Sequence, residues 1–179
     1  MDIVVARYTE DLGWLDAFNG FNIFIYNKGR DGTGIKLDNI GREANTYLYH
    51  IVNNYNNLND SCFLQGNPFH HYKDIKETVE GFNTDFKELG GLLKCDIHGN
   101  PHHGLDNLPL FISKLGLAVP KDLTFITGAQ FLIKKELLYK YSYDFYLTAY
   151  NLTLGDGTSP YIFERLWYYM YKGDLNEEV

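Results

Sequence analysis

The stretch that decides the fold class is NIGREANTYLYHIVNNYNNLNDSCFLQ, residues 39–65. Six apolar side chains in it recur at i, i+3, i+4, i+7, i+8 and i+11, the spacing of one helix face: Ala44, Tyr47, Leu48, Ile51, Val52 and Tyr55. Asn39 precedes this face and is expected to cap the helix. The run from Ser61 to Leu64 then predicts a buried strand, which the polar residues after it bring to an end.

Working outward toward the N-terminus, the sequence adds two more strands. The apolar run Ile3 to Ala6 predicts a buried strand that leads into a short helix at Leu12 to Phe18, and a second strand follows at Phe21 to Tyr26. Strands that alternate with helices imply a mostly parallel sheet with helices on its faces. We therefore expect an α/β fold, built as a single domain over residues 1–179.

The second half of the chain has a looser pattern. An amphipathic stretch from Tyr72 to Leu89 is followed by Gly, His and Pro residues that predict loops up to Pro120. The elements expected after it are a strand at Phe125 to Ile133, helices at Lys134 to Tyr141 and Ser142 to Leu152, and a last helix with Ser159 as N-cap and Pro160 at its first position. The acidic tail, Asp174 to Val179, is expected to fray.

Composition excludes several classes of function. A net charge of −7 at pH 7 argues against a nucleic-acid partner, which needs a basic face. Two cysteines, Cys62 and Cys95, are too few for a disulfide framework and favour a reducing compartment. The N-terminus lacks the pattern of a signal peptide, and no apolar run is long enough to span a membrane, so we expect a cytoplasmic location and no transmembrane segment.

Polar clusters directly follow the three predicted strands of the first half. They are Arg7 to Asp11, Tyr26 to Gly29, and Gln65 to Asn67. Because ligands of open parallel sheets bind beyond the carboxyl ends of the strands, these clusters are the expected binding site. The simpler alternative is that strand ends are polar in any α/β protein.

Six ordered blocks carry a family resemblance: VVARYTEDLGWL, IYNKG, NIGREANTYLYHI, FLQGNPF, GAQFLIKKELL and ERLW. From Ile3 to about Tyr171 they resemble an uncharacterised domain family of microbes, fungi and algal viruses, which in turn is similar to GT-A type glycosyltransferases. The NIGRE block is similar to the NxGRD block of rhamnan-synthesis-type glycosyltransferases. The resemblance implies a GT-A-like, Rossmann-like fold and transfer of a sugar from a nucleotide-diphosphate donor to a hydroxyl of a glycan or glycoconjugate.

Carried over by position, the resemblance implies a donor site. Ala6, Arg7 and Asp11 would line the base and ribose, with Tyr26 and Asn27 beside them. Gly41 and Arg42 would approach the diphosphate, and a glycine at a helix N-terminus with an arginine suits an anion independently of any family. The expected donor-site residues are Ala6, Arg7, Asp11, Tyr26, Asn27, Gly41, Arg42, Gln65, Asn67 and Gln130. Alternatively, Arg42 forms a salt bridge with Glu43 or Asp38.

The requirement for a metal ion is open. GT-A enzymes usually hold Mn²⁺ or Mg²⁺ with a DxD motif, and the matching stretch here, Gln65-Gly66-Asn67, offers only weakly ligating amides. A replacement could come from Asp96, His98 and His103, whose residue types suit Mn, Zn or Fe, with His70 and His71 as possible neighbours. The same loop could instead hydrogen-bond the sugar or diphosphate, or be an ordinary polar loop. A metal-dependent hydrolase built on Asp96, His98, His102 and His103 is the alternative enzyme class.

Glu164 is the first candidate for the catalytic base, and Asp96 is the second. Glu164 lies at the edge of the apolar stripe of the last helix, where a carboxylate can face a cleft and deprotonate an acceptor hydroxyl. It could instead pair with Arg165 or Lys172. Gln130 could bond sugar hydroxyls beside Gly128, which alternatively marks a strand bulge. The third candidate function is a noncatalytic sugar- or nucleotide-binding module.

Overall fold

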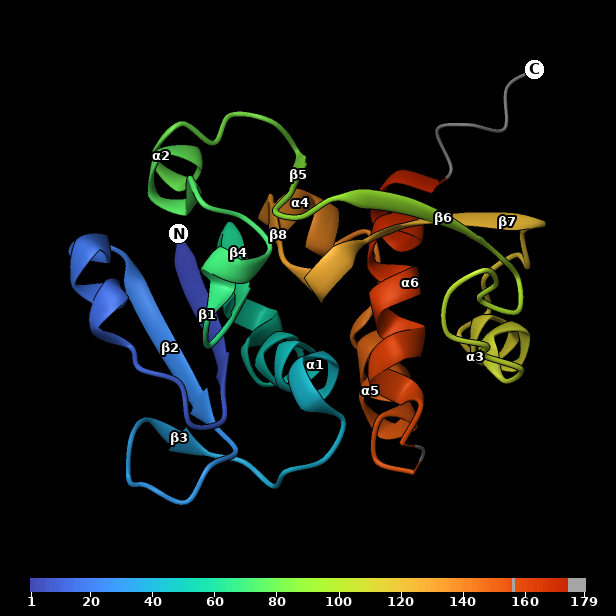
Figure 1. Ribbon diagram of the computed structural model, residues 1–179, viewed down its shortest axis with the longest axis horizontal. Coiled ribbons are helices and arrows are strands. Elements are labelled where there is room, and N and C mark those ends of the chain that lie inside the picture. Colours follow the sequence, from blue (N-terminus) through green and yellow to red (C-terminus); the bar gives the residue numbers. More distant parts are fainter. Residues whose placement is uncertain (156, 174–179) are drawn as a thin grey trace.

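The computed structural model describes residues 1–155 and 157–173, so the acidic tail lies outside the described residues (Figure 1). A mixed sheet of six strands has the order β3-β2-β1-β4-β8-β5. The strands are β1 (Asp2–Arg7), β2 (Asn22–Asn27), β3 (Ile35–Lys36), β4 (Ser61–Gln65), β5 (Phe86–Glu88) and β8 (Phe131–Ile133). The first four run parallel, whereas β8 is antiparallel to both β4 and β5. The expected mostly parallel α/β sheet is confirmed.

Helices cover both faces of this sheet. The apolar side chains of β1 point alternately to one face and to the other, so each face has apolar surface to bury. Val4 packs in a core with α1 (Arg42–Asn54), α5 (Tyr143–Leu152) and α6 (Ser159–Lys172). Ile3 and Val5 pack on the opposite face, against the 3₁₀ helix η1 (Gly13–Phe18) and α2 (Ile75–Glu80). The helix face read from residues 44–55 is the one that α1 buries: Ala44, Tyr47, Leu48 and Ile51 are fully buried.

The region between the two halves is more ordered than the sequence predicts. Residues 90–120, expected to be loops, contain β6 (Leu92–Asp96) and α3 (Leu108–Lys114). The single strand expected at Phe125 to Ile133 is wrong, because η4 (Thr127–Ala129) interrupts it. Gly128 there has φ 79°, a left-handed conformation that ends β7 (Asp122–Ile126), which pairs with β6 in a separate two-stranded sheet, before β8 begins. The remaining short elements are η2 (Tyr55–Asn57), η3 (Pro68–His70) and α4 (Lys135–Leu138).

Two helices begin differently from the prediction. Gly41, with φ 63°, is the N-cap of α1, and Asn39 does not cap it; no side chain of the described chain does. Thr158 rather than Ser159 precedes α6, while Pro160 does lie in its first turn. Ser142, expected to lie at the start of its helix, is the N-cap of α5, because its hydroxyl accepts a hydrogen bond from the Phe145 backbone N–H at 3.2 Å.

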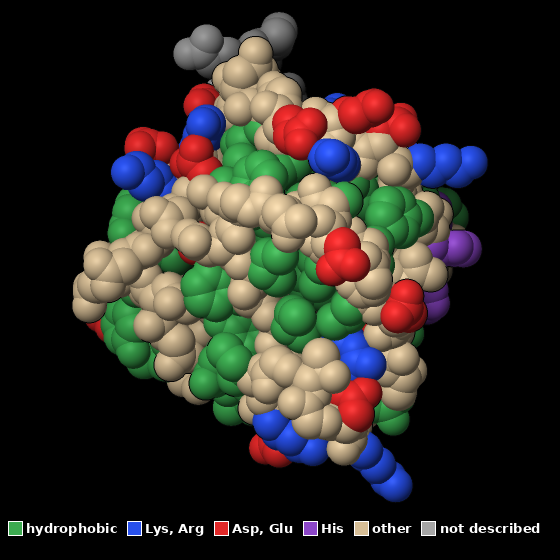
Figure 2. Space-filling model, turned by 90° about the vertical axis from the view of Figure 1, so that its left-hand side faces the viewer, with side chains coloured by type: hydrophobic (Ala, Val, Ile, Leu, Met, Phe, Trp, Pro, Cys, Tyr) green, Lys and Arg blue, Asp and Glu red, His purple; other side chains and the backbone are tan. Residues whose placement is uncertain are grey.

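One flank of the sheet is only partly covered. Figure 2 shows hydrophobic side chains gathered in the middle of the face that carries β2 and β3, where Ile23 and Ile35 are exposed. The two cysteines are buried and unpaired. Within residues 1–155 and 157–173, every helix is too short or too polar to cross a bilayer.

Candidate functional site

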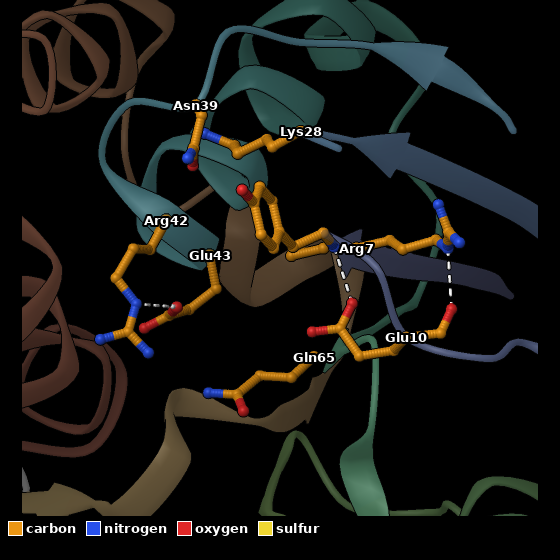
Figure 3. A pocket seen from close by; sticks show the side chains of 9 residues that line it. Arg7, Glu10, Lys28, Asn39, Arg42, Glu43 and Gln65 are labelled. Atoms are coloured by element: carbon orange, nitrogen blue, oxygen red, sulfur yellow. Dashed lines mark hydrogen bonds and ion pairs between the residues drawn. The ribbon is translucent and has the colours of Figure 1, made fainter. Parts of the chain in front are cut away.

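The sheet has a topological switch point between β1 and β4. The chain runs from β1 to β2 and β3 on one side, then returns through α1 to β4 on the other side. Ligands of open α/β sheets bind in the crevice at the carboxyl ends of such strands. A cavity of about 300 Å³ lies there (Figure 3). Its lining residues are Ala6, Arg7, Tyr8, Glu10, Lys28, Asn39, Arg42, Glu43 and Gln65.

The start of α1 forms one wall of this cavity. Gly41 and Arg42 have φ values of 63° and 46°, and a left-handed conformation is strained for arginine, at a cost of about 1–3 kcal/mol. The Arg42 side chain is 58% exposed, and its Nε lies 3.5 Å from Glu43 Oε2. Its Nη1 donates a long hydrogen bond of 3.4 Å to the hydroxyl of Tyr161. The salt bridge with Glu43 is present but loose, which leaves the guanidinium able to bind an anion.

Lys28 follows β2 and supplies a second cation that the sequence analysis did not single out. Its buried Nζ donates to Asn45 Oδ1 at 2.8 Å and to the Ile40 carbonyl, which fixes the loop before α1. Burial lowers the pKa of this ammonium to about 8. An ammonium has three protons, so one donor remains beyond these two contacts. The sequence feature that could have indicated Lys28 is its place in the IYNKG block, directly after the second predicted strand.

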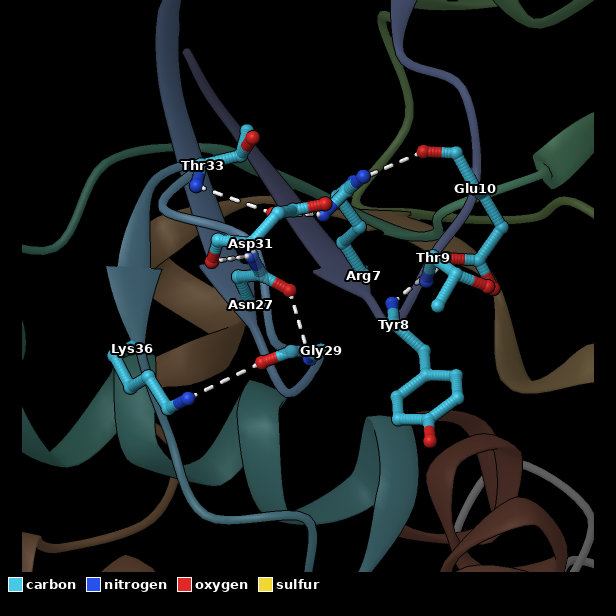
Figure 4. Close-up of polar contacts among 9 residues, drawn as sticks. All are labelled: Arg7, Tyr8, Thr9, Glu10, Asn27, Gly29, Asp31, Thr33 and Lys36. Atoms are coloured by element: carbon cyan, nitrogen blue, oxygen red, sulfur yellow. Dashed lines mark hydrogen bonds and ion pairs between the residues drawn. The ribbon is translucent and has the colours of Figure 1, made fainter.

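Arg7 lines the cavity, but its charge is already paired (Figure 4). Its Nη1 lies 2.8 Å from Asp31 Oδ1, and its Nε donates to the Glu10 carbonyl at 2.9 Å. The same Asp31 oxygen accepts from Asn27 Nδ2 at 2.7 Å, and the Arg7 guanidinium holds the pKa of Asp31 well below its usual range. Arg7 thus lines the cavity, as expected, while its charge fastens the loop after β2 to the end of β1.

Four other predicted donor-site residues do not line the cavity. Tyr26 is buried, with its hydroxyl 2.9 Å from His50 Nδ1. Asn27 is also buried, and its Oδ1 accepts from the Gly29 N–H at 2.8 Å. Asp11 accepts a hydrogen bond from Gly13 at the start of η1, and Asn67 is exposed before η3. These four residues therefore lie outside the lining of the cavity.

Gln130 is a structural side chain, contrary to the sugar-binding role expected for it. It is fully buried, its Oε1 accepts from the Gln65 backbone N–H at 3.0 Å, and its Nε2 donates to the Pro68 carbonyl at 3.1 Å. A longer bond of 3.4 Å reaches the Leu89 carbonyl. Gln65 itself does line the cavity, and its Nε2 donates to the Gly128 carbonyl at 2.9 Å. Gln65 and Gln130 together therefore hold the end of β4 against η4.

Glu164 lies next to the cavity and holds the same turn. Its Oε1 accepts from the Gly128 N–H at 2.8 Å, and its Oε2 pairs with Nη1 of Arg165 at 2.6 Å, as one of the alternatives proposed. Arg165 is buried, with its guanidinium carbon 3.7 Å from the ring centre of Phe125. His71 packs over Gly128, where an added Cβ would be 2.3 Å from its Cδ2. Glu164 thus closes a turn behind the cavity wall.

Glu43 is the cavity residue whose side chain the sequence analysis considered only as a partner for Arg42. Its side chain is 11% exposed and lines the cavity beside Arg42, opposite Lys28 and Asn39 (Figure 3). Burial raises the pKa of this carboxyl, the Arg42 charge lowers it, and the charge of Glu164 raises it further. The apolar periodicity of α1 carries no information about this polar residue, although the NIGRE block contains it.

The histidine loop does not form a metal centre. Asp96 Oδ1 accepts from the backbone N–H groups of His98 and Asn100, at 2.8 and 2.9 Å. His103 instead stacks on Tyr161, with ring centres 4.8 Å apart. Across residues 1–155 and 157–173, no three His, Cys, Asp or Glu side chains are grouped so that they could hold a metal ion. The metal and hydrolase interpretations of Asp96, His98 and His103 are therefore not supported by the structure.

A second cavity, of about 510 Å³, lies at the amino ends of β1 and β4, where it is lined by Met1 and Asp60 among others. Its Lys134 is already paired with Asp60 at 2.7 Å. Open parallel sheets bind ligands at the carboxyl ends of their strands and not at the amino ends. The helix that begins beside this second cavity, α4, is also much shorter than α1. The smaller cavity at the switch point is the better candidate.

Comparison with known proteins adds one family. A family model described as a protein of unknown function (DUF3431) matches residues 3–89, which contain all nine residues that line the switch-point cavity. The chain is similar to this family over the segment from β1 to β5. No curated protein and no solved structure matches the chain.

Proposed function

We propose that the switch-point cavity binds the diphosphate of a nucleotide sugar and that the protein is a GT-A-like glycosyltransferase. The observation that carries this proposal is the convergence of Arg42, Lys28 and the uncapped start of α1 on one cavity beyond the carboxyl ends of β1 and β4. Arginine, an ammonium and free backbone N–H groups are together a strong anion site. The volume of about 300 Å³ lies at the lower end of the range for small-molecule sites.

The remaining lining residues suit the other parts of such a donor. Tyr8, at the end of β1, is 49% exposed and offers an aromatic face to a nucleobase. Ala6 is small enough to let a ring approach the end of β1. Gln65 supplies amide groups where GT-A enzymes usually have carboxylates, so Arg42 and the α1 N-terminus are proposed to balance the charge of the diphosphate.

In the proposed reaction, the acceptor hydroxyl oxygen bonds to the anomeric carbon while the bond from that carbon to the phosphate oxygen breaks. The electron pair leaves with the diphosphate, and a carboxylate takes the hydroxyl proton. Of the two predicted bases, Glu164 is the nearer to the cavity, because it holds the Gly128 turn that the lining residue Gln65 also contacts. Its oxygens are hydrogen-bonded to Gly128 and Arg165, so it takes the proton only when one of these contacts opens. The carboxylate of Asp96 is committed to its own loop. Catalysis is then mainly positioning and stabilisation of the leaving group.

The test is a thermal-shift panel of UDP-, GDP-, CDP-, ADP- and dTDP-sugars, each with and without Mn²⁺. We expect one nucleotide class to raise the melting temperature, because a ligand that binds only the folded state stabilises it. Arg42→Ala should lose this shift, whereas Arg30→Ala removes the same charge from an exposed residue outside the cavity and should keep it. Failure of every donor to shift wild type would refute the proposal. Binding without transfer to any glycan would instead indicate a binding module.

A further inference from the structure

Glu43 is the largely enclosed carboxylate of the switch-point cavity. It is held in the first turn of α1, and its side chain is 11% exposed. The other lining carboxylate, Glu10, is satisfied, because its Oε2 accepts from the N–H groups of Tyr8 and Thr9 at 2.7 and 3.1 Å. In the described chain, by contrast, no backbone N–H of a neighbouring strand end or loop donates a hydrogen bond to the Glu43 carboxylate.

The contacts of Glu43 are weak for a buried charge. Arg42 Nε lies 3.5 Å from Oε2, longer than a good charge-assisted hydrogen bond, and Arg42 is itself 58% exposed. The backbone N–H of Glu43 itself also donates to the carboxylate, and the charge of Lys28 attracts it from across the cavity. Glu164, on α6, adds a repelling charge. Because Glu43 has so few donors from the protein, most of the hydrogen-bonding capacity of its two oxygens is open to a ligand that enters the cavity.

The chemistry of the missing partner can be narrowed by elimination. An anionic group placed directly against Glu43 would be repelled by both Glu43 and Glu164, so the diphosphate is expected to contact Arg42 and Lys28 instead. A metal ion would need further ligands, and the described residues contain no cluster of three that could supply them. A neutral hydroxyl donates a hydrogen bond without adding negative charge, and two adjacent hydroxyls can satisfy both oxygens of one carboxylate.

We propose that Glu43 binds a vicinal pair of hydroxyl groups on the ligand of the switch-point cavity. This inference rests on the proposed function, because a nucleotide sugar carries such a pair on its sugar and, in ribonucleotides, also on its ribose. Arg42 and Lys28 then hold the charged part of the ligand while Glu43 selects for hydroxyls beside it. Glu43 is in this way a specificity-determining residue, since a ligand without the diol leaves its carboxylate unpaired.

The experiment measures dissociation constants by calorimetry for wild type, Glu43→Gln and the matched control Asp38→Asn. Asp38 is exposed and outside the cavity lining, so its variant makes the same change of charge nearby. The ligands are the ribose and 2′-deoxyribose forms of the diphosphate that binds best, its sugar conjugate, and ribose 5-phosphate and glucose 1-phosphate. Circular dichroism and the melting temperature show whether Glu43→Gln remains folded.

If the diol belongs to the ribose, wild type and Asp38→Asn should prefer the ribose form by roughly tenfold, and Glu43→Gln should lose that preference. If it belongs to the sugar, the conjugate should bind roughly tenfold tighter than the free diphosphate, and Glu43→Gln should lose that gain. Equal ligand preferences in wild type and Glu43→Gln would overturn the inference while leaving nucleotide binding intact. Glu43-dependent binding of the sugar phosphates without any nucleotide binding would support the inference and refute the proposed function, and binding of neither class would refute both.

Discussion

Replacing Gln130 by Met separates a structural role from a ligand-binding one. Methionine has a similar length and no hydrogen-bonding amide, so Gln130→Met keeps the volume and removes the contacts to Gln65, Pro68 and Leu89. Because Gln130 is fully buried, the Gln65 N–H and the Pro68 carbonyl would lose partners at a site that water does not reach. The predicted result is a loss of folding stability even without ligand.

The size of this loss follows from the bonds themselves. Two bonds of 3.0 and 3.1 Å have ordinary length, and the third, at 3.4 Å, is weak. A net contribution of about 1 kcal/mol for each good bond, with a further penalty for the buried groups left unpaired, gives a total of roughly 2–4 kcal/mol.

The assay is urea unfolding at pH 7, followed by tryptophan fluorescence. Gln65→Met is the matched control, because it removes one side-chain bond, to the Gly128 carbonyl, from a partly buried position and should cost roughly 1 kcal/mol. If Gln130→Met unfolds at the same urea concentration as wild type but loses affinity for a sugar nucleotide, the structural assignment of Gln130 is wrong.

Three further outcomes are expected. Gly128→Ala should destabilise the fold by at least about 1–2 kcal/mol in urea unfolding, because φ is +79° and the new Cβ would meet the His71 ring at 2.3 Å. The control Gly32→Ala should leave stability unchanged, because Gly32 has open space around it and an ordinary φ. Equal losses of stability in the two variants would contradict this. The stability of wild type should fall by about 3 kcal/mol between pH 6.5 and pH 4, because burial lowers the pKa of His50 to about 4 and protons therefore favour the unfolded chain; an unchanged pH dependence in His50→Gln would refute this source. Asp31→Asn should weaken the bond with Arg7 and raise the amide exchange rates of residues 29–34, and unaltered exchange would show that this pair does not hold the loop.

Periodicity and strand-end rules predicted the part of the site that depends on local sequence. The α1 face from Ala44 to Ile51 could be read directly, since helix spacing alone determines it. Parallel strands also bring their carboxyl ends to one edge, which is why one residue from each predicted polar cluster, Arg7, Lys28 and Gln65, lines the same cavity.

The remaining features depend on contacts between distant segments. Arg7 is paired with Asp31, which lies in a glycine-rich loop that has no periodic pattern. The burial of Gln130 follows from the antiparallel register of β8 beside β4, which the prediction of one continuous strand concealed. Glu43 is polar in a helix that was read through its apolar face, so its burial could not be inferred from spacing.

The most direct test of the account is to locate a bound nucleotide by NMR. With the diphosphate that gives the largest thermal shift, the account predicts that the strongest amide shift changes fall on Tyr8, Lys28, residues 41–43 and Gln65, around the switch-point cavity. Changes centred on Asp60 and Lys134, at the larger cavity on the opposite edge of the sheet, would contradict the central claim that the switch point is the ligand site.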